Sequence, residues 1–272
     1  MTADIHSEIL NDLPENILDD LAAQYISPLP SKIKSDPVMV CFSIEQAFWH
    51  FQTISCRTLK RGSMQEFTRK IFHHLEFLRE HADYVSMVLE EWEDYKSRIP
   101  TFGAVMLNKR MDKVLLVKSA KGFWGFPKGK INEFEEPEDC AAREVLEEVG
   151  LEIRSLINRS NFFQHAESNH FCRLYIISGV KESATLSTSC PQEIRDIKWF
   201  KVEYLPMYLK DERYRSSRQG ISWRKFFNVI PFLPDIVEWV AEENEWQHHK
   251  IIVEQRQMTA LGLPLQFRGR LN

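Results

Sequence analysis

The segment from Gly129 to Leu151 limits how this chain can fold, and what it can bind, more than any other part of the sequence. Three carboxylates, Glu144, Glu147 and Glu148, fall at positions i, i+3 and i+4 of a stretch with strong helical patterning. On a helix they share one face, within reach of a common cation. Side chains that offer only oxygen atoms at this density favour Mg²⁺ or Mn²⁺, hard cations that also bind phosphates. Without such a cation, the three negative charges would repel one another.

The residues that flank these glutamates favour a metal site over an ordinary acidic surface. Gly129 allows a close backbone approach before the helix, and Gly150 suits a left-handed turn at its end. Glu135 and Arg143 are expected to pair and to hold the preceding loop against the helix. A solvated face is the usual fate of a glutamate-rich helix. The glycines and Arg143 make that alternative the weaker interpretation here.

The remaining pattern divides the chain in two near Ser97 to Pro100. Before this point the periodicity is helical: Ser63 to Glu66 has capping-box spacing, and apolar residues from Phe67 to Leu78 continue on one stripe. After it, strand-like runs at 102–107, 113–118, 174–177 and 194–200 alternate with helical stretches at 137–149 and about 222–243, interrupted around Pro231 and Pro234. Such alternation indicates a layered α/β domain. The expected domains are a helical domain at 1–97, a catalytic α/β domain at 98–245 and a C-terminal extension at 246–272.

Composition excludes several classes of protein. The formal net charge of −4 cannot attract long nucleic acid by itself, so a phosphate-rich ligand requires a local basic patch. The five cysteines form no CxxC pair, which argues against a disulfide framework or a thiolate zinc site. No apolar run approaches the roughly 20 residues needed to cross a bilayer, and the polar start is unlike a signal sequence. We therefore expect a soluble, intracellular protein with no membrane partner.

The segment from Gly129 to Leu151 resembles the Nudix box, G-x5-E-x7-R-E-U-x-E-E-x-G-U with U aliphatic, at every defined position. The resemblance implies a Nudix α/β/α sandwich with a mixed sheet and a C-terminal helix, following the all-helical N-terminal domain. It implies that Glu144, Glu147 and Glu148 ligate Mg²⁺ or Mn²⁺, and that the enzyme hydrolyses nucleoside diphosphates linked to another moiety. Gly129, Glu135, Arg143 and Gly150 are then structural residues of the box.

Four further segments resemble the catalytic subunits of mRNA-decapping enzymes: 41–49 (CFSIEQAFW), 124–130, 192–194 and 226–233. This similarity spans about residues 13 to 244. It implies hydrolysis of the 5′ cap of mRNA with release of methylated GDP and 5′-monophosphate RNA. It also implies a small decapping-activator protein bound to the regulatory N-terminal domain, and a cytoplasmic location that includes mRNA-decay granules.

Several residues outside the acidic helix acquire roles from this resemblance. Glu193 matches a loop glutamate that is a candidate general base, and it counts with Glu148 and Lys130 as catalytic. Lys128 and Lys130 are placed to contact the bridging phosphates. Without the resemblance, Glu193 is also explained as a solvated surface carboxylate, and the two lysines as charged residues that keep a surface loop soluble.

A basic stretch from Lys210 to Lys225, interleaved with aromatic residues, suits an RNA backbone and its bases. A solvated face over a core helix is the alternative. The candidate RNA-binding side chains in it are Arg213, Arg215, Arg218, Arg224 and Lys225.

Two aromatic residues are candidates for cap binding. Trp49 aligns with a tryptophan that stacks on the cap guanine, and Phe227 with an aromatic position on the opposite wall. Both also fit buried core aromatics. The family usually has an acidic residue four places after the tryptophan, and this chain has Thr53 there, so the preferred type of cap stays open.

Two rival functions remain at this point. One is a Nudix pyrophosphatase that acts on free dinucleoside polyphosphates or diphosphoinositol compounds, which would need neither a helical domain nor an RNA path. The other is a scaffold that binds cap or RNA and has a silent catalytic site. The complete set of glutamates in the box argues against the scaffold.

Overall fold

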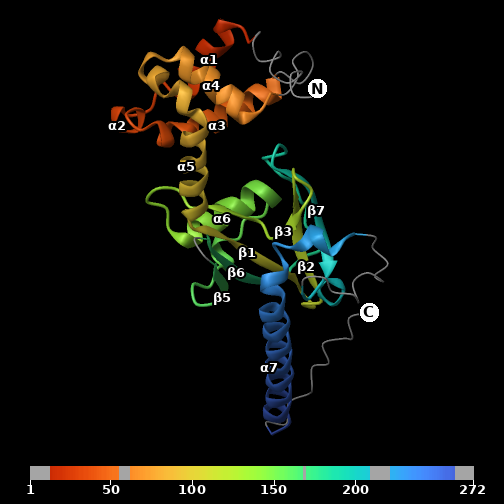
Figure 1. The fold of residues 1–272 in the computed structure, drawn as a ribbon. Coiled ribbons are helices and arrows are strands. Elements are labelled where there is room, and N and C mark those ends of the chain that lie inside the picture. The colour runs from red at the N-terminus through yellow and green to blue at the C-terminus, as the bar shows by residue number, and fades with distance from the viewer. Residues whose placement is uncertain (1–12, 55–61, 168–169, 209–220, 261–272) are drawn as a thin grey trace. The chain divides into compact units, whose positions relative to one another are not determined.

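The computed structural model describes residues 13–54, 62–167, 170–208 and 221–260 (Figure 1). The chain forms two compact units, Met1–Ile99 and Pro100–Asn272, called here the helical unit and the sheet unit. None of the helices in the described ranges is long and apolar enough to cross a membrane.

The regular elements in the described part of the helical unit are all helices, as the periodicity predicts. They are α1 (Glu15–Tyr25), α2 (Ser31–Lys34), α3 (Pro37–Ile54), α4 (Met64–His74), the 3-10 helix η1 (Glu76–Tyr84) and α5 (Val85–Arg98). Ser63 begins α4 with the expected capping box: its Oγ accepts from the backbone N–H of Glu66, whose side chain accepts from the backbone N–H of Ser63.

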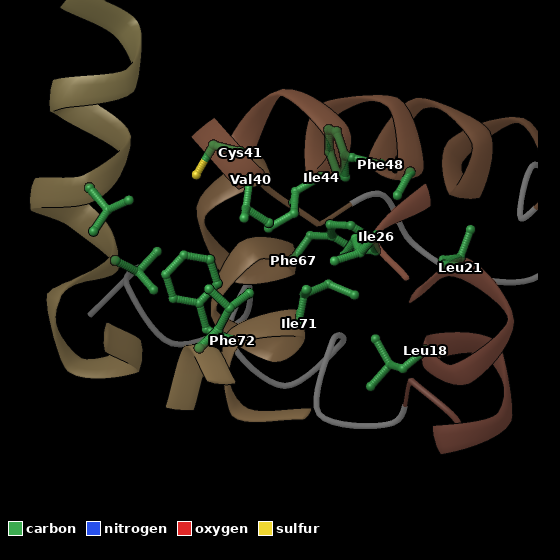
Figure 2. Close-up of a cluster of buried hydrophobic side chains, with 14 of the residues drawn as sticks. Leu18, Leu21, Ile26, Val40, Cys41, Ile44, Phe48, Phe67, Ile71 and Phe72 are labelled. Carbon is green, nitrogen blue, oxygen red and sulfur yellow. The ribbon is translucent and has the colours of Figure 1, made fainter. Parts of the chain in front are cut away.

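The apolar stripe that begins in α4 does not continue as one α-helix. Leu75 adopts an extended backbone conformation, and the chain resumes as the 3-10 helix η1. This break turns Leu78 into a core where Ile44, Phe67 and Phe72 are also fully buried. Figure 2 shows how the side chains of α3 and α4 meet in this cluster. The helical spacing thus predicts that Leu78 is buried but does not predict the break at Leu75.

The sheet unit contains a mixed sheet, as expected. Its strands are β1 (Thr101–Asn108), β2 (Lys113–Ser119), β3 (Trp124–Gly125), β4 (Lys128–Lys130), β5 (Phe162–Glu167), β6 (His170–Val180) and β7 (Ile194–Lys201). Their order is β3-β2-β1-β6-β5, with β4 paired to β1 and β7 paired to β2. The β1–β6 pair is parallel and the others are antiparallel. The sequence pattern did not predict β3, β4 or β5.

Helices cover both faces of this sheet. Val145 and Val149 of α6 (Pro137–Val149) pack with Met106 on one face, while Leu233 and Ile236 of α7 (Leu233–Ala260) belong to the cluster on the other. Short 3-10 helices complete the unit: η2 (Arg154–Leu156), η3 (Val202–Tyr204), η5 (Trp223–Phe226) and η6 (Ile230–Phe232). The layers therefore form the predicted α/β/α sandwich.

The last helix differs from the expected stretch. The structure has two separate 3-10 turns before α7, and α7 continues to Ala260 instead of ending near Glu243 (Figure 1). Pro234 does not interrupt α7, because it lies in the first turn, where no backbone N–H is needed.

Candidate active site

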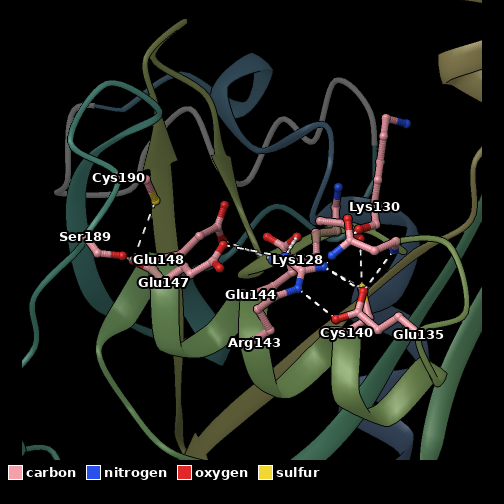
Figure 3. Close-up of polar contacts among 12 residues, drawn as sticks. Lys128, Lys130, Glu135, Cys140, Arg143, Glu144, Glu147, Glu148, Ser189 and Cys190 are labelled. Carbon is pink, nitrogen blue, oxygen red and sulfur yellow. Dashed lines mark hydrogen bonds and ion pairs between the residues drawn. The ribbon is translucent and has the colours of Figure 1, made fainter. Parts of the chain in front are cut away.

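Helix α6 presents the acidic face that the sequence predicts. Pro137 lies in its first turn and Gly150 ends it in the left-handed region, with φ of 77°. Val145 and Val149 are fully buried against the sheet, which directs the glutamates away from the core. Figure 3 shows Glu144, Glu147 and Glu148 on α6 together with Lys128 of β4.

The guanidinium of Arg143 fastens the loop before α6 to the helix. Its Nε and Nη2 donate to the two carboxylate oxygens of Glu135 at 2.7 and 2.9 Å, so the expected pair is present and bidentate. Nη1 donates to Glu144 at 2.7 Å, and Nη2 also donates to the carbonyl oxygen of Lys130 at 3.1 Å. The hydrogen bonds from Arg143 hold the pKa of the Glu135 carboxyl below its ordinary value. One arginine therefore links the loop, the end of β4 and the acidic face.

Glu144 is confined between Arg143 and Gly129. Its side chain is only 13% exposed, and a β-carbon built on Gly129 would overlap its carboxylate. Burial raises the pKa of Glu144, hydrogen bonding to Arg143 opposes this, and the charges of Glu147 and Glu193 raise it further. The glycine is thus needed for the space that the carboxylate occupies.

Glu148 is the most enclosed of the three glutamates, with 8% of the residue exposed. Its Oε2 accepts a hydrogen bond from the backbone N–H of Lys128 at 3.0 Å. Burial raises the pKa of Glu148 to about 8, and the charges of Glu144 and Glu193 contribute to the increase. Glu147, in contrast, has a side chain that is 47% exposed.

Glu193 belongs to the same cluster although it lies far away in the sequence. It sits in the turn that precedes β7, and its charge raises the pKa of both Glu144 and Glu148. Its backbone N–H donates to the carbonyl of Cys190 at 2.9 Å, and its own carbonyl accepts from the N–H of Ala120 at 2.7 Å. The structure thus brings the candidate base within electrostatic reach of the acidic helix.

The donor chemistry of this cluster fits a hard divalent cation. In the described part of the chain, no group of three His, Cys, Asp or Glu side chains forms a preformed metal cage: Glu144 is turned to Arg143, and Glu148 to the N–H of Lys128. The available donors are nevertheless carboxylate oxygens that raise each other's pKa. Oxygen donors with excess negative charge favour the binding of a divalent cation.

The two candidate phosphate-binding lysines flank Gly129 on β4. Lys128 pairs with Gly103 and Lys130 with Thr101 on β1, and both lysines are half-buried. Because side chains alternate along a strand, Lys128 and Lys130 point to the same side of β4. The β-carbon position of Gly129, between them, faces Glu144 on the other side of the strand, while the charge of Lys128 acts to lower the pKa of Glu148.

Comparison with protein families assigns both units. The model of the NUDIX domain matches residues 97–223, and that of the Dcp2 box A domain matches residues 16–95. The chain carries a Dcp2 box A domain followed by a NUDIX domain. Nudix hydrolases are generally dependent on divalent metals, which agrees with the donor set on α6.

Three curated relatives are similar in sequence to most of this chain. The chain is 36% identical to the m7GpppN-mRNA hydrolase dcap-2 of Caenorhabditis elegans over 86% of the chain's own length. It is 31% identical to mRNA-decapping enzyme subunit 2 of Arabidopsis thaliana over 85%, and 34% identical to mRNA decapping complex subunit 2 of Schizosaccharomyces pombe over 84%. The chain spans 30%, 62% and 31% of the length of these relatives, respectively.

Beyond the NUDIX match, Phe227 lies just after η5 and is 45% exposed, so it is not a core residue. Its ring packs edge-on against Phe123, with centroids 5.1 Å apart and planes at 82°. Lys225 places its Nζ 4.8 Å from the centroid of the Phe123 ring. The sequence analysis did not single out Phe123, which directly precedes the segment 124–130.

Of the other candidate RNA-binding residues, the structure describes only Arg224. Arg224 is exposed, and its guanidinium lies 5.6 Å from the ring centroid of Trp223. Arg213, Arg215 and Arg218 lie outside the described residues.

In the box A domain, Trp49 lies on α3 and is 37% exposed, which sets it apart from the buried Phe48 beside it. Thr53 donates its hydroxyl to the carbonyl oxygen of Trp49 at 2.9 Å. Lys96 of α5 pairs with Glu45 at 2.5 Å and joins α5 to the helix that carries Trp49. The box A domain thus presents a partly open indole ring on a braced helix.

Proposed function

We propose that this chain removes the 5′ cap of RNA by metal-dependent hydrolysis and releases methylated GDP and 5′-monophosphate RNA. One observation supports this most: Glu193 lies within electrostatic reach of the glutamates on α6, in a NUDIX domain that follows a Dcp2 box A domain. Relatives at 31–36% identity that are named as mRNA-decapping proteins support the choice of capped RNA.

Glu144, Glu147 and Glu148 are the proposed ligands of Mg²⁺ or Mn²⁺. When bound, such an ion neutralises negative charge at the phosphates and polarises a phosphoryl oxygen. Arg143 holds Glu144 in place, and the N–H of Lys128 does the same for Glu148. The chain thus provides an oriented set of oxygen donors.

Glu193 is the proposed general base, which accepts a proton from the water that attacks the phosphate bridge. Lys128 and Lys130 would neutralise the oxygens of that bridge from β4. Phe227 in the sheet unit and Trp49 in the helical unit are each a candidate ring for the cationic methylguanine, which gains stacking and cation–π attraction on an aromatic face. Arg224 and Lys225, with Arg213, Arg215 and Arg218, would follow the RNA backbone.

The box A domain is the proposed docking site for a small decapping-activator protein. A decapping enzyme would act in the cytoplasm, including mRNA-decay granules. Both proposals rest on similarity to the family.

The assay that tests the substrate uses the full chain with Mn²⁺ and RNA labelled in its cap, with free cap dinucleotide in a parallel reaction. We expect methylated GDP from the long RNA and little product from the free dinucleotide. Cleavage of free dinucleotides alone would overturn the RNA assignment and favour a pyrophosphatase for small substrates. Absence of cleavage, with RNA still bound, would favour a silent scaffold.

A further inference from the structure

The segment Ser187–Cys190, called the strap here, is fastened to the C-terminal end of α6. The last turn of a helix leaves carbonyl oxygens without a partner inside the helix. In this protein the carbonyl of Glu147 accepts from the backbone N–H of Ser189 at 2.8 Å, from its Oγ at 3.1 Å and from Oγ1 of Thr188 at 3.2 Å. Figure 3 shows Ser189 and Cys190 beside Glu147.

These donors make Glu147 the anchor of the strap. The C-terminal end of a helix carries partial negative charge, which favours hydrogen-bond donors there. The Sγ of Cys190 also lies 3.5 Å from the same carbonyl oxygen, although a carbonyl has only two lone pairs. Several donors therefore share one acceptor, and together they fix the strap to a single residue of α6.

A second contact sets the direction of the strap. The N–H of Ser187 donates to the carbonyl of Val149 at 3.0 Å, just before the helix ends at Gly150. A β-carbon on Gly150 would lie 2.7 Å from Oγ and 2.8 Å from the carbonyl oxygen of Ser187. Gly150 therefore leaves room for the strap, in addition to ending the helix.

The strap leads directly to Glu193. The carbonyl of Cys190 accepts from the N–H groups of Glu193 and Ile194 at 2.9 and 3.0 Å. On the other side, the N–H of Ala120 holds the carbonyl of Glu193. The β2–β7 register shifts between Lys118 and Ser119, next to this turn, and such irregularities redirect side chains. The backbone of Glu193 is thus fixed between the strap and the end of β2.

We propose that Thr188 and Ser189 are positioning residues that hold Glu193 over the acidic face of α6 through the main-chain carbonyl of Glu147. This inference rests on the proposed function, because it assigns the proton-accepting step to Glu193. Glu147 then has two tasks: its carboxylate is a proposed metal ligand, and its carbonyl holds the segment that carries the base. A shift of this helix end would move ligand and base together.

The test removes the hydroxyl groups while the backbone bond from Ser189 stays. Thr188→Val with Ser189→Ala removes both side-chain bonds to Glu147, and also the bond from the N–H of Cys190 to Thr188. The matched control is Ser183→Ala, an exposed serine earlier in the same connection. We expect kcat to fall about 10-fold at unchanged KM, because geometry and not binding is lost. Ser189→Thr keeps a hydroxyl group at this position, so this variant should retain most of the wild-type kcat.

Combination with Glu193→Gln separates positioning from general destabilisation. If the strap acts through Glu193, adding the two strap substitutions to Glu193→Gln should lower kcat no further. Losses that multiply, or an unchanged kcat in the strap variant, would overturn the proposal. Should the double strap variant unfold, Ser189→Ala alone supports the same comparison. If the wild type cleaves only free dinucleotides, the RNA assignment fails, yet the same comparison of rates on that substrate still decides the role of the strap.

Discussion

The carboxylate of Glu144 fills the space that a side chain on Gly129 would need: a β-carbon added to the glycine would overlap the carboxyl carbon of the glutamate. The two residues come from different elements, β4 and α6, and the absence of a side chain on one determines where the side chain of the other can lie. The spacing between the first glycine and the first helical glutamate of the box therefore has a direct steric meaning.

Gly129→Ala should separate activity from stability. The overlapping atoms belong to the end of a flexible side chain, so Glu144 can swing away. This movement weakens its hydrogen bond to Arg143 but relieves repulsion from Glu147 and Glu193, so we expect the free energy of unfolding to change by less than about 1 kcal/mol. Displacing a proposed metal ligand should lower kcat roughly 10- to 100-fold. Urea unfolding and steady-state kinetics measure both quantities.

Gly103→Ala is the contrasting control. Its β-carbon would overlap the carbonyl oxygen of Pro127 and the backbone of Lys128, where nothing can swing aside. We expect a loss of stability of about 1–3 kcal/mol from this overpacking. Equal stability losses in the two variants would contradict this account of Gly129.

The bidentate pair between Arg143 and Glu135 should contribute measurably to the stability of the NUDIX domain. Only 14% of the Glu135 side chain is exposed, so its removal leaves a partly buried guanidinium without a main partner. We expect a coupling energy of about 1–3 kcal/mol between Arg143→Ala and Glu135→Ala in a double-mutant cycle. A coupling energy near zero in urea unfolding would show that solvent replaces the pair.

Phe123→Ala should weaken cap binding through Phe227. An edge-on aromatic pair contributes about 0.5–1.5 kcal/mol, so KM for capped RNA should rise roughly 2- to 10-fold at unchanged kcat. Adding Phe123→Ala to Phe227→Ala should raise KM little beyond the single Phe227 variant. If the KM of Phe123→Ala equals that of the wild type, Phe123 has no role in cap binding.

Cys41 and Cys140 should resist alkylation in the folded protein. Burial is the main cause that raises the pKa of each thiol to about 12, and only the thiolate reacts. At pH 8 we expect iodoacetamide to modify both cysteines at least about 100-fold more slowly than in urea, by peptide mass spectrometry. Raising the pH towards 12 without unfolding should increase the rate. Fast modification of Cys140 at pH 8 in the native state would contradict its enclosure beside Arg143.

Sequence patterns predicted the elements whose ends carry their own signals. Helix α6 has the bounds expected from its starting Pro137 and its terminal Gly150, since both residues act through local backbone geometry. The pairing of Glu135 with Arg143 was also predicted from the opposite charges that flank the acidic face, and the structure confirms it. Glu193 was predicted from resemblance, and its proximity to α6 is visible only in the fold.

Other features depend on contacts that no local pattern reveals. The apolar spacing of an α-helix continues across Leu75, so nothing in the pattern marks the change to the 3-10 helix that carries the buried Leu78. Strand β5 is short and lacks clean alternation, so its pairing with β6 defines it. The strap is held chiefly by backbone groups and hydroxyls, which carry no periodic signal.

The most direct test of the central claim compares the wild type with Glu148→Gln on cap-labelled RNA, with and without Mg²⁺ or Mn²⁺. Gln keeps the size of the side chain and removes the charge that a cation needs. We predict release of methylated GDP by the wild type only when the metal is present, and loss of turnover with retained RNA binding in Glu148→Gln. Unchanged turnover in that variant, or turnover in chelator, would contradict the assignment of these glutamates to a metal-dependent decapping site.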